Sequence, residues 1–321
     1  MPVRRLALIA ALAALLAPGL WLRDPAPVRD FTFSVTPLGH PPTQAGPFTL
    51  AGWWALDGRD RRFGGLSALT VMDQGRFLAA SDTGRFALFP VPQGPTGRAR
   101  NTGRMERSSR PDTLPKTGVD IEALARDPST GMLWAAYENG NRIARFSSDL
   151  RPQASRRIPE MRGWLKNSGP ESLVRLADGR FLAIEESAGK TGGTAHRALL
   201  FPGDPVRDRP ARRLTIERVE SYRIVDAARL DQTIWLLLRE VRWGVPPRFD
   251  TALARFPVSA LKRDRIAPEL VAQFGTAIPR DNYEGLAIEK RAGQPTRFWI
   301  VSDDNFSSFQ SSWLLALDFR P

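Results

Sequence analysis

Cysteine is absent from this chain of 321 residues, and only two of its residues are histidine. Without thiols the protein has no disulfide framework, no cysteine nucleophile and no zinc site built on cysteine. Two histidines are also too few for a site made of imidazoles. A metal bound to this protein would therefore be held by oxygen atoms, which suits hard divalent cations.

Lysine is scarce as well, because only five of the 46 basic residues are lysine and the other 41 are arginine. The 46 basic residues against 34 acidic ones give a formal net charge of +12. The arginines are scattered, and no run of five or six like charges appears, which disfavours a nucleic-acid-binding stripe. We expect a monomer that binds no nucleic acid and acts on a small anionic or phosphorylated molecule.

Long apolar runs are absent except for one, which extends from Leu6 to Leu22 behind Arg4 and Arg5. This pattern is typical of an export signal. Its 17 residues would span about 25 Å as a helix, short of the ~30 Å hydrocarbon core of a bilayer. We favour a signal peptide at residues 1–22 and keep an uncleaved membrane anchor as the alternative. Either way the protein is expected to be periplasmic or otherwise exported.

Helical periodicity is nearly absent from the remainder, where short apolar runs alternate with Gly, Asp, Asn and Pro. Residues 23–44 form a proline-rich segment that ends in one alternating run, beginning at Phe31. Residues 45–321 are predicted to form a single all-β domain.

An internal repeat indicates which all-β fold this is. Five units each contain a short apolar strand, a turn and a stronger strand that ends in an acid, and their anchor residues lie 49 to 58 residues apart: Ser67, Glu122, Glu171, Asp226 and Glu284. Such periods are typical of β-propeller blades. The segments Phe31–Val35, Phe48–Leu56 and Gln93–Pro115 are left over and could form a sixth blade, so we predict a six-bladed propeller. The strand near Phe31–Val35 would close the last blade by pairing with Trp313–Phe319.

The repeat also places carboxylates together, because the two strands of each hairpin begin and end with an acid at the same edge. The predicted pairs are Glu122 with Glu138, Glu171 with Glu186, Asp226 with Glu240 and Glu284 with Asp303, while the first unit keeps only Asp82 beside Ser67. Crowded like charges repel unless a cation lies between them. Calcium fits this oxygen-rich set, and its predicted ligands are drawn from Glu122, Glu138, Glu171, Glu186, Glu284 and Asp303, with Asp82 and Glu240 at the margin.

A purely structural interpretation uses arginine as the cation. Arg85, Arg142, Arg239 and Arg280 could bridge the acids and hold the blades in register. Other motifs fail. The chain has no G-x-S-x-G elbow for Ser-His-Asp chemistry, and Gly189–Thr191 lacks the earlier glycine of a phosphate loop. His196 could act as a general acid if it reached the acids, but a surface histidine is the better expectation.

The repeat units resemble a known family. GLSAL followed by SDTGRF, DIEALARDPSTGMLWAAYENGNRIARF, PESLVRLADGRFLAIEES, and NYEGLAIE followed by FWIVSDDNF are similar to the phytase-like domain, also named for the esterase-like activity of phytase. The resemblance extends from about Phe63 to Phe319. It implies a six-bladed propeller with an acidic calcium site and phosphoester hydrolysis. Substrate phosphates would then contact basic and amide side chains beside the strand-end acids: Arg85, Lys190, Arg239 and Asn305. Ser67, and the absence of a glycine after Asp226, depart from the repeated pattern.

Three functions therefore stay open. The first is a calcium-dependent phosphoester hydrolase, in which the metal polarises a phosphoryl oxygen and activates water. The second is a non-catalytic binding or scaffold propeller, because a fold does not determine a function. The third is a lactonase-like hydrolase with a single metal, for which Asn282 or Asn305 would supply an amide ligand.

Overall fold

The protein is described from a computed structural model that covers the whole chain. The description that follows applies to residues 31–40, 43–60, 62–92, 101–107, 119–138, 140–165, 168–188, 193–244, 247–307 and 310–321. The predicted signal or anchor at residues 1–22, the linker as far as residue 30, and Lys190 lie outside these residues. No helix in the described part is long and apolar enough to cross a membrane.

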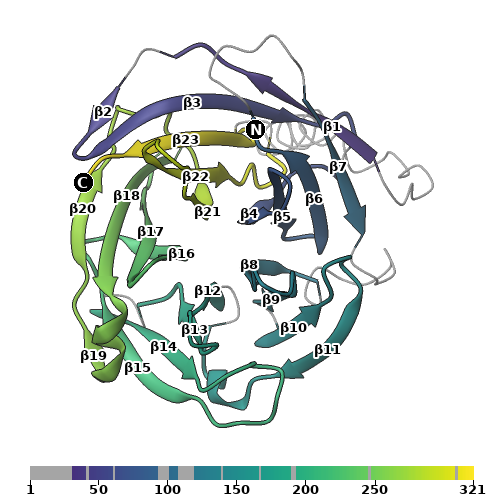
Figure 1. Ribbon diagram of the computed structural model, residues 1–321. Coiled ribbons are helices and arrows are strands. Elements are labelled where there is room, and N and C mark those ends of the chain that lie inside the picture. Colours follow the sequence, from purple (N-terminus) through teal and green to yellow (C-terminus); the bar gives the residue numbers. More distant parts are fainter. Residues whose placement is uncertain are drawn as a thin grey trace, which may run out of the picture.

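The strands form five antiparallel blades of four strands around a central axis (Figure 1). Blade 1 contains β4 (Leu66–Met72), β5 (Arg76–Ser81), β6 (Arg85–Pro90) and β7 (Asn101–Arg107). Blade 2 contains β8 (Ile121–Arg126), β9 (Leu133–Tyr137), β10 (Arg142–Phe146) and β11 (Pro152–Arg157). Blade 3 contains β12 (Pro170–Arg175), β13 (Phe181–Glu185), β14 (Ala195–Phe201) and β15 (Arg212–Glu217).

The last two blades follow the same plan. Blade 4 contains β16 (Arg223–Leu230), β17 (Thr233–Arg242), β18 (Arg248–Pro257) and β20 (Glu269–Gln273). Blade 5 contains β21 (Tyr283–Glu289), β22 (Thr296–Ser302), β23 (Trp313–Phe319) and β3 (Phe48–Asp57). Smaller elements are β1 (Phe31–Pro37), β2 (Gln44–Ala45), β19 (Arg265–Ile266) and the 3₁₀ turns η2 (Pro159–Met161) and η3 (Val258–Lys262).

The first strand of each blade faces the axis, and each of these inner strands contacts the inner strands of the two neighbouring blades. Blades pack through aromatic and aliphatic side chains. Trp235 of blade 4, for example, lies edge-on to Phe298 of blade 5, with ring centroids 4.8 Å apart. Burying such large apolar surfaces between blades is the main stabilising contribution to this fold. The inner strands are thereby fixed closely enough to position a site.

The predicted six blades are wrong, because the described residues form five. The segments assigned to a sixth blade complete two others. β7 is the outer strand of blade 1, and β3 is the outer strand of blade 5. Repeat counting missed this because both strands lack the anchor acid of a repeat unit.

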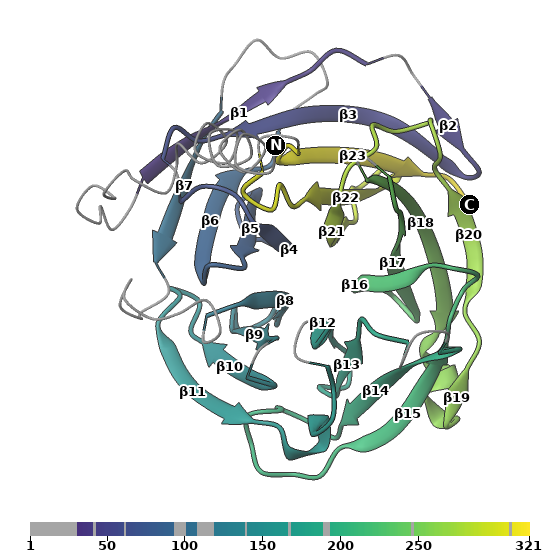
Figure 2. The same cartoon turned by 180° about the vertical axis from the view of Figure 1, so that it is seen from behind.

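The predicted partner of the C-terminal strand is also wrong. β3 pairs with β23, with Phe48 opposite Phe319, whereas β1 pairs with β3 and with β7 (Figure 2). β3 suits the closing position because its ten residues alternate between buried and half-buried side chains along nearly the whole strand. β1 then joins blade 5 to blade 1 in one continuous sheet.

Candidate functional site

Every inner strand carries a β-bulge near its start, where one residue is left out of the ladder. These residues are Ser67, Glu122, Glu171, Val225 and Glu284. A second position lies on the neighbouring strand, directly after the partner of the residue that precedes the bulge, and contains Asp82, Glu138, Glu186, Arg239 and Asp303. A bulge bends its strand and redirects its side chain. These ten residues, from five equivalent hairpins, are called the acidic mouth below.

Blade 4 differs from the sequence-based alignment by one residue on both strands. Asp226 pairs with Leu237 inside the ladder, and the unpaired position is taken by Val225. On β17 the position at the mouth belongs to Arg239, so the predicted pairing of Asp226 with Glu240 is wrong. Glu240 lies opposite Asp250 and contacts Arg242, away from the mouth. Blade 4 therefore contributes a cation instead of two acids.

Asp226 has a structural role in the seam between blades 4 and 5. Its carboxylate accepts hydrogen bonds from the backbone N–H of Ala227 at 2.7 Å and of Leu286 at 2.6 Å. Burial raises its pKa well above the ordinary value. This acid ties two inner strands together and is not a candidate metal ligand.

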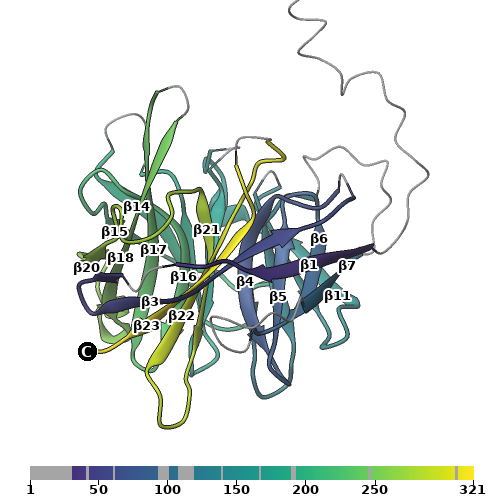
Figure 3. The ribbon, with the colours of Figure 1, turned by 90° about the horizontal axis from the view of Figure 1, so that it is seen from above.

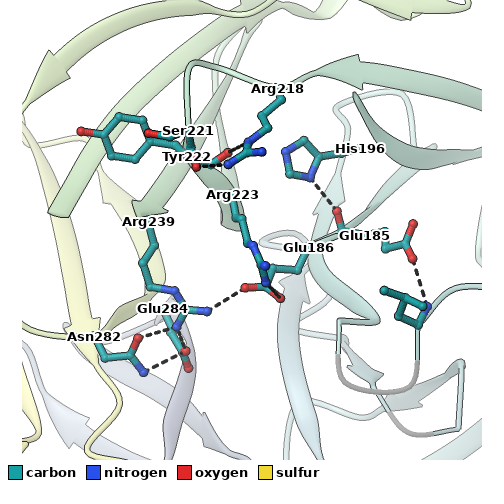
Figure 4. Close-up of polar contacts among 11 residues, drawn as sticks. Glu185, Glu186, His196, Arg218, Ser221, Tyr222, Arg223, Arg239, Asn282 and Glu284 are labelled. Atoms are coloured by element: carbon teal, nitrogen blue, oxygen red, sulfur yellow. Dashed lines mark hydrogen bonds and ion pairs between the residues drawn. The ribbon is translucent and has the colours of Figure 1, made fainter. Parts of the chain in front are cut away.

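Arg239 bridges three blades at the mouth (Figure 4). Its guanidinium donates to Glu186 at 2.7 Å and also to Glu284 and Asn282. Its pKa is raised above the ordinary value because the surrounding acids outweigh the cost of burial. Arg239 thus compensates the acids of blades 3 and 5, as the structural interpretation of the sequence expected for this arginine.

The side of the mouth formed by blade 2 contains three converging carboxylates. Asp120, Glu122 and Glu138 each contribute one carboxylate oxygen, and these three oxygens lie within 4.8 Å of one another. Burial and four neighbouring acids raise the pKa of Glu122 well above its ordinary value, and burial together with Asp120 raises the pKa of Glu138 to about 8. This concentration of charge favours a bound cation.

Gly169 packs directly against Glu138 of this cluster. Its backbone N–H donates a hydrogen bond to Glu138. A Cβ atom at Gly169 would lie 3.0 Å from both the Cα and Cγ atoms of Glu138. The absence of a side chain therefore lets the chain of blade 3 approach the acid of blade 2.

Glu171 lies between the two halves of the mouth. Burial and the neighbouring Glu186, Glu138 and Glu284 raise its pKa well above the ordinary value, while Arg239 acts in the opposite direction. Glu171 lies near Glu138 of the blade 2 cluster on one side and near Arg239 on the other. Of the predicted ligands, Glu122, Glu138 and Glu171 therefore each have further acids among their close neighbours.

The remaining side of the mouth contains residues that organise loops. Ser67 donates its hydroxyl to the carbonyl of Ile121 on the next inner strand. Asp303 accepts from the backbone N–H of Asn305 at 2.7 Å, and burial with Glu284 and Asp82 nearby raises its pKa well above the ordinary value. The buried Asp82 lies directly beside Gly65, whose Cβ would fall 2.2 Å from its carboxylate.

The predicted substrate-binding residues are separated by the fold. Arg85 is buried, with its guanidinium 5.8 Å from the centre of the Phe31 ring. Arg239 is at the mouth but engaged by acids, while Asn305 is exposed at its edge. Of the other arginines expected to bridge acids, Arg142 stacks on Tyr137, and Arg280 contacts Asp250, which is not a mouth residue, at 3.3 Å.

The surface position expected for His196 is wrong. Its side chain is fully buried in blade 3, and Nδ1 lies 3.1 Å from the carbonyl oxygen of Glu185 (Figure 4). Burial lowers its pKa to about 4. His196 is therefore a neutral core residue at physiological pH.

Two site residues escaped the sequence analysis as contributors in their own right. Asp120 stands two positions before Glu122, and Asp304 directly follows Asp303. Asp304 accepts from the backbone N–H of Gly65 and of Phe306, both at 3.0 Å, and from the hydroxyl of Ser312. The sequence signal for both is a second acid within two positions of a predicted mouth acid.

A family model described as "Phytase-like: Esterase-like activity of phytase" matches residues 61–306. This chain belongs to the phytase-like family. The match includes all ten positions of the acidic mouth. The six blades that the sequence resemblance implied are five in this phytase-like chain.

No curated protein matches the phytase-like chain. Solved structures do. The β-propeller domain of Cps50 (Swd1) from Myceliophteria thermophila is 10% identical, with a TM-score of 0.39 over 90% of this chain and 100% of that one. A streptogramin B lyase is 9% identical, with a TM-score of 0.38 over 91% of this chain and 98% of that one. Hydrazine synthase from Kuenenia stuttgartiensis is 11% identical, with a TM-score of 0.38 over 76% and 78%.

Proposed function

We propose that this phytase-like protein is an exported phosphoester hydrolase that requires calcium at its acidic mouth. The proposal depends chiefly on one observation, the convergence of Asp120, Glu122 and Glu138 within 4.8 Å. The apolar run Leu6–Leu22 behind two arginines supports export.

The donor set fits calcium in its chemistry. All three groups are carboxylates, the oxygen ligands that hard cations prefer, and the chain offers no cysteine that would favour a softer metal. The raised pKa of Glu138, about 8, reflects its burial and the neighbouring Asp120, and a bound cation would offset both. A bound calcium supplies positive charge that attracts phosphoryl oxygens and lowers the pKa of a bound water.

The charges of the mouth explain why an anionic substrate would need that metal. Seven of the ten mouth positions carry carboxylates, and the single arginine among them is bonded to Glu186 and Glu284. A phosphate that enters among these acids without a cation between them would be repelled. The uneven distribution directs a cation toward blade 2, because Arg239 already compensates the opposite side.

A non-catalytic binding propeller remains the second candidate, and the bridge made by Arg239 favours it. Three blades are held together there by charged hydrogen bonds with no need of a ligand. The lactonase-like alternative loses support, because the Asn282 amide is engaged by both Arg239 and Glu284.

The metal is tested by thermal melting of the purified protein in EDTA and in calcium. At about 100 times Kd, calcium should add roughly 2.7 kcal/mol to the free energy of unfolding. Glu122→Gln should abolish that gain, since the amide keeps the shape and removes the charge. Glu240→Gln is the matched control, because Glu240 lies outside the mouth, and should respond like the parent. An unchanged melting temperature of the parent in calcium would refute the site.

The reaction is tested separately with phosphate monoesters, inositol phosphates and lactones, with and without calcium. Calcium-dependent phosphate release that Glu122→Gln abolishes is the expected result. Calcium binding without turnover of any of these substrates would support the binding propeller instead.

A further inference from the structure

Three large hydrophobic side chains are exposed in the described part of the chain. Trp243 is 90% exposed, Leu165 is 48% exposed and Phe306 is 40% exposed. They come from three different connections: β17 to β18, β11 to β12, and β22 to β23. Isolated exposed hydrophobic residues are ordinary, but their distribution over the molecule carries information.

All three connections lie on the face that carries the acidic mouth. In an antiparallel blade, the second strand ends on the same face as the first strand begins, and the link to the next blade returns to it. Trp243 and Phe306 follow second strands, and Leu165 precedes the first strand of blade 3. In Figure 3 the hairpin of β17 and β18 rises on the same side as the β22–β23 loop. No large hydrophobic side chain is exposed on the opposite face of the described residues.

The hairpin of β17 and β18 combines this tryptophan with positive charge. Both strands have ten residues, and Arg242 pairs with Arg248 at the last ladder position before Trp243. Arg242 contacts Asp250 at 2.6 Å, and the Arg248 side chain is exposed. An exposed tryptophan that follows directly on a pair of arginines suits the boundary between lipid headgroups and acyl chains, where Trp is enriched and Arg meets anionic phosphates.

The N-terminal part of the chain joins the propeller at this same face. Phe31, the first residue of β1, pairs with Met105 near the end of β7. The end of β7 pairs with Arg85 at the start of β6, three residues after Asp82 of the mouth. Only eight residues separate Phe31 from the apolar run that ends at Leu22, and eight residues span at most about 28 Å. If that run stays in a membrane, the mouth face remains close to the bilayer.

We infer that the mouth face docks on an anionic phospholipid surface, with Trp243, Leu165 and Phe306 at the interface and Arg242 and Arg248 against the headgroups. This inference goes beyond the proposed hydrolysis and does not depend on it. Arg242 and Arg248 determine the occupant, because a neutral apolar ligand would have no use for two arginines beside Trp243. Docking would place the mouth within reach of molecules at the membrane surface.

The test uses the full chain with vesicles of phosphatidylglycerol and phosphatidylcholine in equal parts, and with vesicles of phosphatidylcholine alone. EDTA is present throughout, so that calcium cannot bridge lipid to the acidic mouth. Failure of docking is thereby distinguished from failure of the metal site. The emission of Trp243 is isolated by subtracting the spectrum of Trp243→Phe from that of the parent.

On anionic vesicles we expect the isolated emission to shift to the blue and to be quenched by brominated lipid. We expect the same shift and quenching for protein with residues 1–22 and for protein without them. For protein without residues 1–22, Trp243→Ser should weaken binding about tenfold and Arg248→Gln about fivefold. Arg209→Gln is the control of equal charge, because exposed Arg209 lies in the β14–β15 connection on the opposite face, and it should bind like the parent.

Two results would overturn the inference. One is vesicle-bound protein in which the Trp243 emission stays that of an indole in water, unquenched by brominated lipid. The other is binding to anionic vesicles that Trp243→Ser and Arg248→Gln leave unchanged. Either would mean that this face serves a partner other than a membrane.

Discussion

Single residues decide the character of the acidic mouth. At the two mouth positions of blade 4, Val225 and Arg239 stand where three other blades carry two acids each. Val225 is buried and carries no charge, while Arg239 extends to Glu186 and Glu284. Leaving one partner of such a buried charged set unpaired is costly, so the arginine and its acids depend on one another.

His196 offers a prediction about pH at this scale. Its folded pKa, about 4, lies below the ordinary 6.5 because burial disfavours the charged ring. The unfolded chain therefore binds the proton more readily, and stability is lost as the pH falls from 6.5 toward 4. We expect His196 to account for about 3 kcal/mol of the stability lost between pH 7 and pH 4.

The measurement is urea unfolding of the parent and of His196→Asn at both pH values. The asparagine variant should be less stable than the parent at pH 7 and should lose less on acidification. Other buried acids, such as Asp281 with a pKa of about 6, contribute equally to both proteins and cancel in the comparison. Equal losses in parent and variant would contradict a neutral buried His196.

At the scale of elements, closure depends on β3 more than on the strand expected from the sequence. β3 lies between β23 and β1, so both its edges are paired, and the side chain of Trp54 lies 5.5 Å from Trp299 between ring centroids. Because β3 precedes all five inner strands in the chain and pairs with the last blade, it joins the two ends of the ring. Losing its packing would open the fold at this seam.

Trp54→Ala should lower the free energy of unfolding by about 3 to 5 kcal/mol, because it removes a large buried side chain and leaves a cavity. Thr32→Ala, at an exposed position of β1, is the control and should change it by less than about 0.5 kcal/mol. Thermal or chemical unfolding measures both. A Trp54→Ala protein as stable as the parent would mean that β3 does not close the ring.

For the whole molecule, the mouth is a balance of charge to which all five blades contribute. Acids from different blades repel across the axis, and the only cation at the ten mouth positions belongs to blade 4. Removing a charge should therefore change the free energy of unfolding in opposite directions on the two sides of the mouth. Glu122 has only acids among its strongest electrostatic neighbours, while Glu284 is bonded to Arg239.

Without calcium at pH 7, Glu122→Gln should raise the free energy of unfolding by about 1 to 2 kcal/mol, because it removes a repelled, desolvated charge. Glu284→Gln should lower it by about 1.5 to 3 kcal/mol, because it removes a charged hydrogen bond from a buried arginine. Denaturant titration of both variants in EDTA gives the two signs. Two changes of the same sign would show that the mouth is not divided into a half that Arg239 compensates and a half that it does not.

Much of this protein was predictable from its sequence, because local patterns carry the information. Alternating apolar runs with turn residues predict strands, and acids that recur at strand ends predict a charged mouth whatever the number of blades. Glu122, Glu138, Glu171, Glu186, Glu284, Asp303 and Asp82 all occupy mouth positions, as their spacing indicated. Their expected role as calcium ligands stays a prediction.

Only the tertiary structure decided the number of blades, the closing strand and the residues that blade 4 contributes. Strands such as β3 and β7 join blades through pairing between distant segments, which leaves no repeat in the chain. A β-bulge changes the register by one residue, and a side chain then points to the other face of its strand. An alignment of acids could therefore mistake Asp226 and Glu240 for mouth residues, whereas the backbone pairing places Val225 and Arg239 there.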